Sequence, residues 1–146
     1  MKRNIFIFLS LFALTACEQK SLEFEKLEQF SKIDTIMDNG IPYYYRKDLY
    51  IVKNYKDNLK NERTIDSFAY KNKILDTMYA EYKILMYNHS NETNIENLKN
   101  NPKDFDRYTF VNDQMFMYVW SKGRWSGKFK FNGLEMTRGE EMIRED

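Results

Sequence analysis

Cysteine and histidine are almost absent from this chain of 146 residues, which contains one of each, Cys17 and His89. One cysteine cannot form a disulfide within the chain, so the fold must be held together by packing alone. Zinc sites take most of their ligands from cysteine and histidine, usually at least three. The sequence therefore predicts no metal site, and nothing in it indicates another cofactor.

Glycine and proline are also scarce, with five and two residues respectively. No glycine-rich loop of the kind that cradles phosphate groups is present, so nucleotide binding is not expected. A Ser-His-Asp triad needs a histidine base, but His89 lies in the asparagine-rich stretch Asn88-His89-Ser90-Asn91. We expect His89 to be a solvated loop residue, and no Gly-x-Ser-x-Gly motif accompanies it.

Basic and acidic residues nearly balance, with a formal net charge of +1. Lys2 and Arg3 lie at the very start of the chain, and without them the net charge is about −1. Nucleic-acid-binding proteins usually carry a strong basic excess or patch, so no nucleic-acid partner is expected. The remaining length suits one domain, which can bury roughly two thirds of its unfolded surface.

The first residues have the organisation of a secretory signal. Lys2 and Arg3 form a positive start, and residues 5–13 are apolar except for Ser10. A charged region, a short apolar region and small residues at a cleavage point define such a signal. The apolar stretch is shorter than the roughly 20 residues that a membrane-spanning helix needs. We therefore expect residues 1–16 to be removed on export.

Leu14-Thr15-Ala16-Cys17 follows the apolar stretch and resembles the lipobox of bacterial lipoproteins. In that family the cysteine thiol receives diacylglycerol and becomes the first residue of the mature protein. The resemblance covers only the first 17 residues and implies that Cys17 anchors the chain in the bacterial cell envelope, in the outer or inner membrane. Two acyl chains give stable attachment where one is marginal. The alternative is a cytosolic protein in which Cys17 is a small buried apolar residue.

The mature chain is predicted to have three parts: a lipidated tether at 17–35, an α+β domain at 36–136 and a charged tail at 137–146. The polar segment 18–29 has two interpretations. A loosely ordered tether is favoured, since chain termini are often poorly ordered. A short amphipathic helix remains the alternative, because Phe24, Leu27 and Phe30 recur near helical spacing.

The first half of the predicted domain begins with a turn at 38–40, where asparagine and glycine tolerate a positive φ. Residues 41–45 and 49–55 are rich in Tyr, Ile and Val and are typical of strands, with 46–48 closing a hairpin between them. A polar loop is expected over 57–63.

A helix is predicted over 64–73 with Thr64 as N-cap. The segment 79–87 suits either a helix or a strand by periodicity, and its aromatic and aliphatic content favours the strand. A short helix capped by Thr93 or Asn94 should end before Pro102.

Three strands are predicted in the C-terminal third, at 108–111, 115–120 and 125–131. In the last, Trp125, Gly127, Phe129 and Phe131 alternate with serine and lysine, as expected for an antiparallel strand with one wet face. Strands that follow one another after one or two helices are typical of an α+β fold. We expect a small single domain with an antiparallel β-meander and the helices packed on one of its faces.

One group of residues suggests a binding surface. Trp120, Arg124 and Trp125 flank the last predicted turn, with Lys128 and Lys130 behind them. Tryptophan and arginine are enriched at binding hot spots, and this group could grip a protein, a glycan or an anionic lipid. The alternative is that both tryptophans belong to the core face of the sheet and the lysines to its wet face.

The sequence favours a non-catalytic role. An exported, lipid-anchored domain with few catalytic residue types suggests an envelope protein that binds a protein or ligand, either as an inhibitor or immunity-type protein or as an accessory subunit. The partner is expected to be another envelope protein. A small envelope hydrolase is the alternative, because Asp104, Asp106 and Asp113 lie close together in the chain and paired carboxylates can cleave glycosidic bonds.

Overall fold

A computed structural model describes residues 20–100, 110 and 112–139 of the chain. These residues form a mixed β-sheet with two helices, which confirms the α+β class. The elements in chain order are β1 (Glu23–Lys26), β2 (Lys32–Asp38), β3 (Ile41–Lys53), α1 (Leu59–Lys71), β4 (Tyr79–Asn88), α2 (Ile95–Asn100), β5 (Gln114–Ser121), β6 (Arg124–Asn132) and β7 (Glu135–Arg138).

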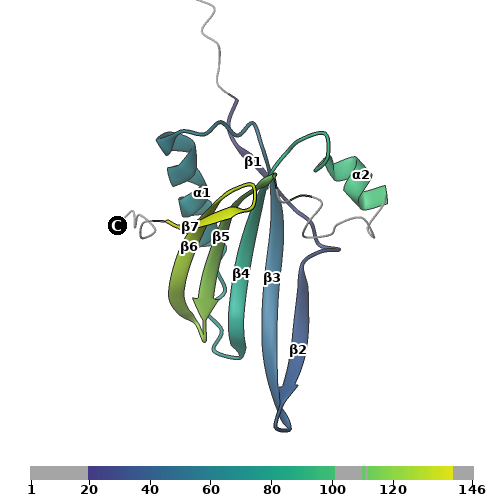
Figure 1. The fold of residues 1–146 in the computed structure, drawn as a ribbon, viewed down its shortest axis with the longest axis vertical. Helices are drawn as coiled ribbons and strands as arrows, with labels where there is room; N and C mark the ends of the chain where they lie inside the picture. The colour runs from purple at the N-terminus through teal and green to yellow at the C-terminus, as the bar shows by residue number, and fades with distance from the viewer. Residues whose placement is uncertain (1–19, 101–109, 111, 140–146) are drawn as a thin grey trace, which may run out of the picture.

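The strands form one seven-stranded sheet in the order β1-β3-β4-β5-β6-β7, with β2 beside β1 on the same edge of β3 (Figure 1). Only β3 and β4 run parallel, and α1 connects them. A parallel pair needs such a crossover, whereas antiparallel neighbours can be joined by tight turns. Every other pair is antiparallel, and β5, β6 and β7 follow one another in this way.

Strand β3 runs without a break from Ile41 to Lys53, so the hairpin predicted at 46–48 is wrong. The polar residues at 46–48 suggested a turn, but two of them, Arg46 and Asp48, find hydrogen-bond and ion-pair partners while they remain in the strand. Asp48 accepts a hydrogen bond of 2.8 Å from the Tyr82 hydroxyl, and Arg46 lies 3.5 Å from the same carboxylate. The predicted turn at Asn39 and Gly40 is confirmed, since both residues have positive φ.

Helix α1 begins at Leu59, so the predicted loop at 57–63 and the predicted N-cap Thr64 are wrong. Asn58 caps the helix instead, because its side-chain oxygen accepts a hydrogen bond of 2.9 Å from the Asn61 backbone N–H. Thr64 lies within the helix and donates from its hydroxyl to the Lys60 carbonyl. An asparagine is as good a cap as a threonine, and the polar residues after Asn58 form the exposed first turn.

Two ambiguous segments are settled by the sheet and by a local cap. The segment 79–87 is strand β4, as favoured, because it lies between β3 and β5. The short helix after Asn94 is also confirmed as α2. The Asn94 side chain accepts a hydrogen bond of 2.9 Å from the Glu96 backbone N–H, which is the geometry of an N-cap.

The segment 23–26 is strand β1, so neither a tether nor a helix describes these residues. Phe24 explains the difference, because its ring stacks on Phe68 of α1 with the centroids 3.9 Å apart. Leu27 follows directly and is fully buried. At the other end, β7 extends to Arg138 and includes the first residues of the predicted tail. The predicted strand at 108–111 lies outside the described residues, except for Phe110 in a turn.

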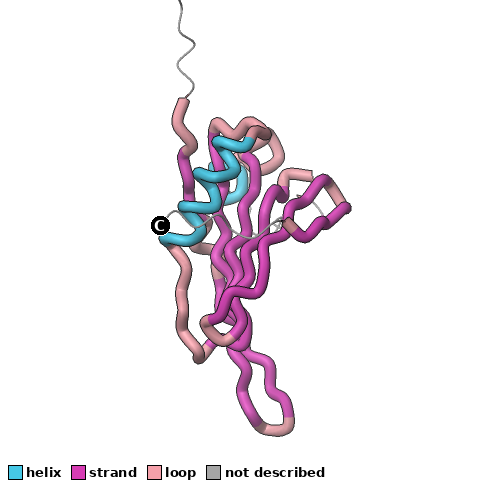
Figure 2. Tube along the Cα trace, turned by 90° about the vertical axis from the view of Figure 1, so that its left-hand side faces the viewer, coloured by secondary structure: helices cyan, strands magenta, loops and turns pink. Residues whose placement is uncertain are grey.

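Two apolar clusters lie on opposite faces of the sheet, because successive residues of a strand point in opposite directions. The first contains Tyr50 and Val52 of β3 together with Ile65 and Ala69 of α1. Figure 2 shows α1 lying against this side of the sheet. The second contains Leu49 and Ile51 of β3, and its other members are Leu27, Tyr87, Leu98 and Phe110. No helix among the described residues has the length and hydropathy to cross a membrane.

Candidate functional site

The predicted binding surface is divided by the fold. Trp120 is only 2% exposed and belongs to the core under α1, as the alternative interpretation had it. Trp125 is half-buried and packs against the same cluster, with its ring centroid 5.3 Å from that of Trp120. Arg124 is exposed at the turn, whereas Lys128 is 4% exposed. The expectation that Lys128 lies on a wet face is therefore wrong.

A β-bulge explains why the predicted faces of β6 are wrong. The register shifts between Val119 and Trp120, so that Tyr118 pairs with Lys128 while Trp120 pairs with Trp125. Side chains of paired residues share a face, and an inserted residue moves those beyond it to the other face. Trp125 therefore shares the α1 side with Lys128, and not the opposite side with Gly127 as simple alternation predicts.

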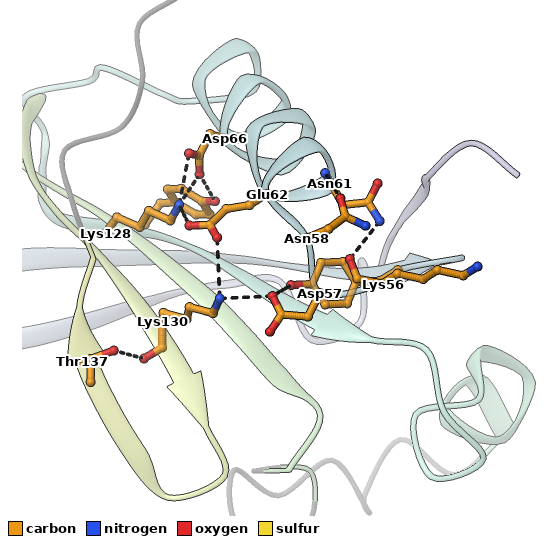
Figure 3. Close-up of polar contacts among 11 residues, drawn as sticks. Lys56, Asp57, Asn58, Asn61, Glu62, Asp66, Lys128, Lys130 and Thr137 are labelled. Carbon is orange, nitrogen blue, oxygen red and sulfur yellow. Dashed lines mark hydrogen bonds and ion pairs between the residues drawn. The ribbon is translucent and has the colours of Figure 1, made fainter. Parts of the chain in front are cut away.

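Lys128 is the centre of a buried ion cluster that joins β6 to α1 (Figure 3). Its ammonium lies 2.6 Å from Glu62 Oε1 and 2.8 Å from Asp66 Oδ1. The Tyr118 hydroxyl donates a further hydrogen bond of 2.6 Å to Asp66. Burial raises the pKa of Tyr118 well above its ordinary value, and the charge of Asp66 adds to this, so Tyr118 stays a neutral donor. Each charged group in the cluster has a partner of opposite charge, which suits a structural role in holding α1 against β6.

Lys130 continues this network toward the surface. Its ammonium lies 3.2 Å from Asp57 and 3.6 Å from Glu62 (Figure 3). Burial lowers the pKa of Lys130, but the hydrogen bond to Asp57 and the charge of Glu62 outweigh it and leave the pKa raised. For Glu62, burial acts to raise the pKa, and Lys128 and Lys130 overcome it. Both lysines thus hold neighbouring carboxylates.

Of the three carboxylates proposed for a hydrolase, only Asp113 lies among the described residues. Asp104 and Asp106 lie outside the described residues. Asp113 accepts a hydrogen bond of 2.5 Å from the Ser90 hydroxyl, which fastens the loop after β4. His89 is exposed in that loop, as expected. Within the described ranges no group of three or more His, Cys, Asp or Glu side chains is placed to hold a metal ion.

A groove lies on the face of the sheet opposite α1, and sequence analysis did not find it. It has a volume of about 300 Å³, and residues from β3, β4, β5, β6 and β7 line it. Lys47 and Lys83 supply charge, while the wall is largely apolar and includes Leu85, Met117, Phe131 and Met136. We call these six residues the basic groove. Each lysine stands two residues before a leucine, but only the register of the parallel strands brings the two pairs together.

Two residues of the basic groove, Lys47 and Lys83, belong to a row of lysines that crosses three strands. Lys32 of β2 pairs with Lys47 of β3, which pairs in turn with Lys83 of β4. Lys32 has Asp34 at 3.1 Å and Lys83 has Glu81 at 2.7 Å. Within the described part of the chain, the central Lys47 makes no ion pair. Like charges placed directly opposite one another destabilise a sheet, so this row works against folding.

A second open surface is the hairpin formed by β2 and β3. All seven residues of β2 are exposed. Ile33, Ile36, Met37 and Ile41 are each at least half exposed, and we call these four residues the apolar tip. In Figure 1 this hairpin projects from the end of the molecule that lies farthest from the start of β1. Within the described sheet β2 pairs with β3 alone, which leaves its outer edge open.

No protein family, curated protein or solved structure matches this chain. The assignment of a function therefore depends on the chemistry of the two open surfaces, the basic groove and the apolar tip.

Proposed function

We propose that this chain is a lipoprotein of the bacterial envelope, anchored through Cys17, that binds a protein partner through the apolar tip. The observation that carries the proposal is the exposed apolar hairpin at the end of the domain farthest from the start of β1 (Figure 1). Exposed apolar surface costs solubility, and contiguous patches of it mark interaction sites. An anchor at Cys17, six residues before β1 begins, would present this hairpin away from the membrane.

The open edge of β2 suggests how the partner is held. An exposed strand edge offers unpaired N–H and C=O groups to which an extended segment of another protein can add as a further strand. The exposed side chains Ile33, Ile36 and Met37 would then give the added segment apolar contacts on both faces. This mode of binding suits an inhibitor or immunity-type protein as well as an accessory subunit. In this chain, α1 and the strands β5, β6 and β7 would form the rigid support for the hairpin.

The non-catalytic role is supported by the two buried carboxylates of the described residues, because neighbouring side chains engage both. Asp66 is held by Lys128 and Tyr118, and Asp48 by Lys26 at 3.3 Å and by the Tyr82 hydroxyl. Burial and the charge of Asp48 both raise the pKa of Tyr82, which keeps its proton on the hydroxyl. A carboxylate that already accepts these bonds is poorly placed to act as a base.

The anchor is tested by replacing the acylated residue. We expect Cys17→Ala to remain uncleaved or unlipidated, because no thiol is left to receive diacylglycerol. Fatty-acid labelling and the mass of the purified protein measure this directly. Ser10→Ala keeps the apolar stretch and the lipobox, and it should be labelled and cleaved normally. Normal lipid labelling of the Cys17→Ala protein would contradict the anchor.

The partner surface is tested with a photo-crosslinker at Thr35, between the apolar side chains of β2, in intact envelopes. We expect one adduct, whose cross-link maps to an extended segment of an envelope protein. Ile36→Asp should reduce its yield at least tenfold, because a buried charge without a partner is strongly unfavourable at an interface. Leu134→Asp is the matched control, since Leu134 is 81% exposed but lies on the turn between β6 and β7.

The result that contradicts this proposal is equally specific. If Ile36→Asp and Leu134→Asp give the same adduct in the same yield, the apolar tip does not form the interface. Both side chains are more than half exposed, so neither change should disturb the fold, and a comparison of their thermal unfolding checks this.

A further inference from the structure

We propose that the basic groove binds a small amphiphile with a single hydrocarbon chain and an anionic head group, such as a fatty-acid carboxylate. This goes beyond the proposed function, because the basic groove lies on the face of the sheet opposite α1 and shares no residue with the apolar tip. The ligand class follows from the order of charge and apolar surface along the groove.

The head-group end is formed by Lys47 and Lys83. Their backbones pair across β3 and β4, so both ammonium groups project from neighbouring positions on the same face. Lys83 already has Glu81 at 2.7 Å, whereas Lys47 makes no ion pair among the described residues. A carboxylate accepts hydrogen bonds from two lysines at once, and charge-assisted bonds of this kind are stronger than neutral ones.

The tail end is apolar and comes from the strands farther along the chain. Leu85 and Met117 pair across β4 and β5, and Phe131 and Met136 pair across β6 and β7. All four side chains line the same groove. Its volume of about 300 Å³ is at the small end of the range for small-molecule sites, which suits one short acyl chain and excludes a two-chain lipid.

The arrangement also costs stability without an anion. Burial lowers the pKa of Lys47, and the charge of Lys32 lowers it further. The charge of Asp34 opposes this, and the charge of Lys83 adds to the lowering. A half-buried lysine between two others is a local conflict of the kind that proteins retain at functional sites. A bound carboxylate would remove this conflict, because it supplies the ion-pair partner that no described residue gives to Lys47.

The test uses the purified full chain and follows its methionine methyl groups by NMR during titration with octanoate. We expect saturable shifts of the Met117 and Met136 signals, which lie in the groove, and no such shifts of Met37 and Met78. Two probes separate the contributions of head and tail. Octanol has the chain without the charge, and acetate has the charge without the chain. Both should bind at least tenfold more weakly than octanoate.

The matched variants are Lys47→Gln and Lys56→Gln. We expect Lys47→Gln to weaken octanoate binding about tenfold, which is the effect of one lost hydrogen bond to a charged group. The same change should raise the Tm of the free protein, because it relieves the repulsion within the lysine row. Lys56→Gln alters an exposed lysine before α1 and should change neither quantity.

Three results would overturn the proposal. One is the absence of saturable shifts at Met117 and Met136. Another is octanol binding as tightly as octanoate, which would show that the lysines do not recognise the head group. The third is unchanged octanoate affinity in a folded Lys47→Gln protein. All three results are read at the groove in the full chain, whether or not Cys17 is acylated, and none involves the apolar tip, so failure here is distinguishable from failure of the proposed function.

Discussion

Lys128→Ala is expected to destabilise the domain by about 3–5 kcal/mol, the usual cost of removing one partner from a buried ion pair. Glu62 and Asp66 would remain close together without the ammonium that lies 2.6 Å and 2.8 Å from them. Asp66 is 3% exposed, so its charge would lose its ammonium partner at a site that is largely shielded from water. Unfolding in urea, followed by circular dichroism, measures the difference.

Lys60→Ala is the matched control for this prediction. Lys60 lies on the same helix as the two carboxylates, but it is exposed. Its replacement should change the free energy of unfolding by less than about 0.5 kcal/mol, as is usual for such surface positions. If the two alanine variants unfold at the same urea concentration, Lys128 does not clamp the helix to the sheet.

The pH dependence of stability offers a second readout of the same clamp. The pKa of Glu62 is lowered in the folded protein from an ordinary value of 4.5, because Lys128 and Lys130 outweigh the effect of burial. Its contribution to stability is therefore complete above pH 4.5 and is lost as the pH falls through the lowered folded pKa. Lys128→Ala should flatten this acid-side loss, since the main cause of the lowered pKa is gone.

Local patterns predicted those elements whose signals lie within a few residues. The β5 strand has a long aromatic and aliphatic run, β6 alternates aromatic with polar residues, and α2 follows a polar cap at Asn94. The turn at Asn39 and Gly40 is likewise encoded by residues that tolerate positive φ. The signals for these elements lie within the elements themselves, and the structure contains them largely as predicted.

The predictions of secondary structure were wrong where a polar or aromatic residue has its partner in a distant part of the chain. The Arg46 and Asp48 charges suggested a turn, but Tyr82 and Lys26 provide partners that allow β3 to continue through them. The segment before residue 35 looked polar enough for a tether, yet Phe24 gains a stacking partner in α1. Neither partner is close in sequence, so no window of residues could have indicated it.

The candidate sites depended even more on register than the strands did. One inserted residue in β6 moved Trp125 to the same side as Lys128 and invalidated the predicted alternation. The lysine row exists only because β3 and β4 pair in parallel with Lys47 opposite Lys83. Sequence analysis identified lysines and aromatic residues as the relevant chemistry, but the fold alone decides which of them meet.

Trp120→Ala is expected to destabilise the domain by about 3–5 kcal/mol, as large-to-small changes of buried aromatic residues generally do. Its indole is 2% exposed and stacks with the rings of Tyr82 and Tyr118 at centroid distances of 5.6 Å and 6.5 Å. Truncation would leave a cavity that three rings border, and rigid strands on both sides limit its collapse. The free energy of unfolding in urea measures the loss.

Trp125→Ala is the informative comparison, because Trp125 contacts the same cluster but is only half-buried. We expect it to lose about 1–2 kcal/mol, roughly half the transfer free energy of a large apolar side chain with some lost ring contact. An equal loss in both variants would place Trp125 fully within the core. A folded Trp125→Ala protein that no longer yields the Thr35 adduct would instead make its exposed half part of the interface. Because Trp125 lies one tight turn from Trp120, that result would extend the binding surface along the α1 side of the sheet.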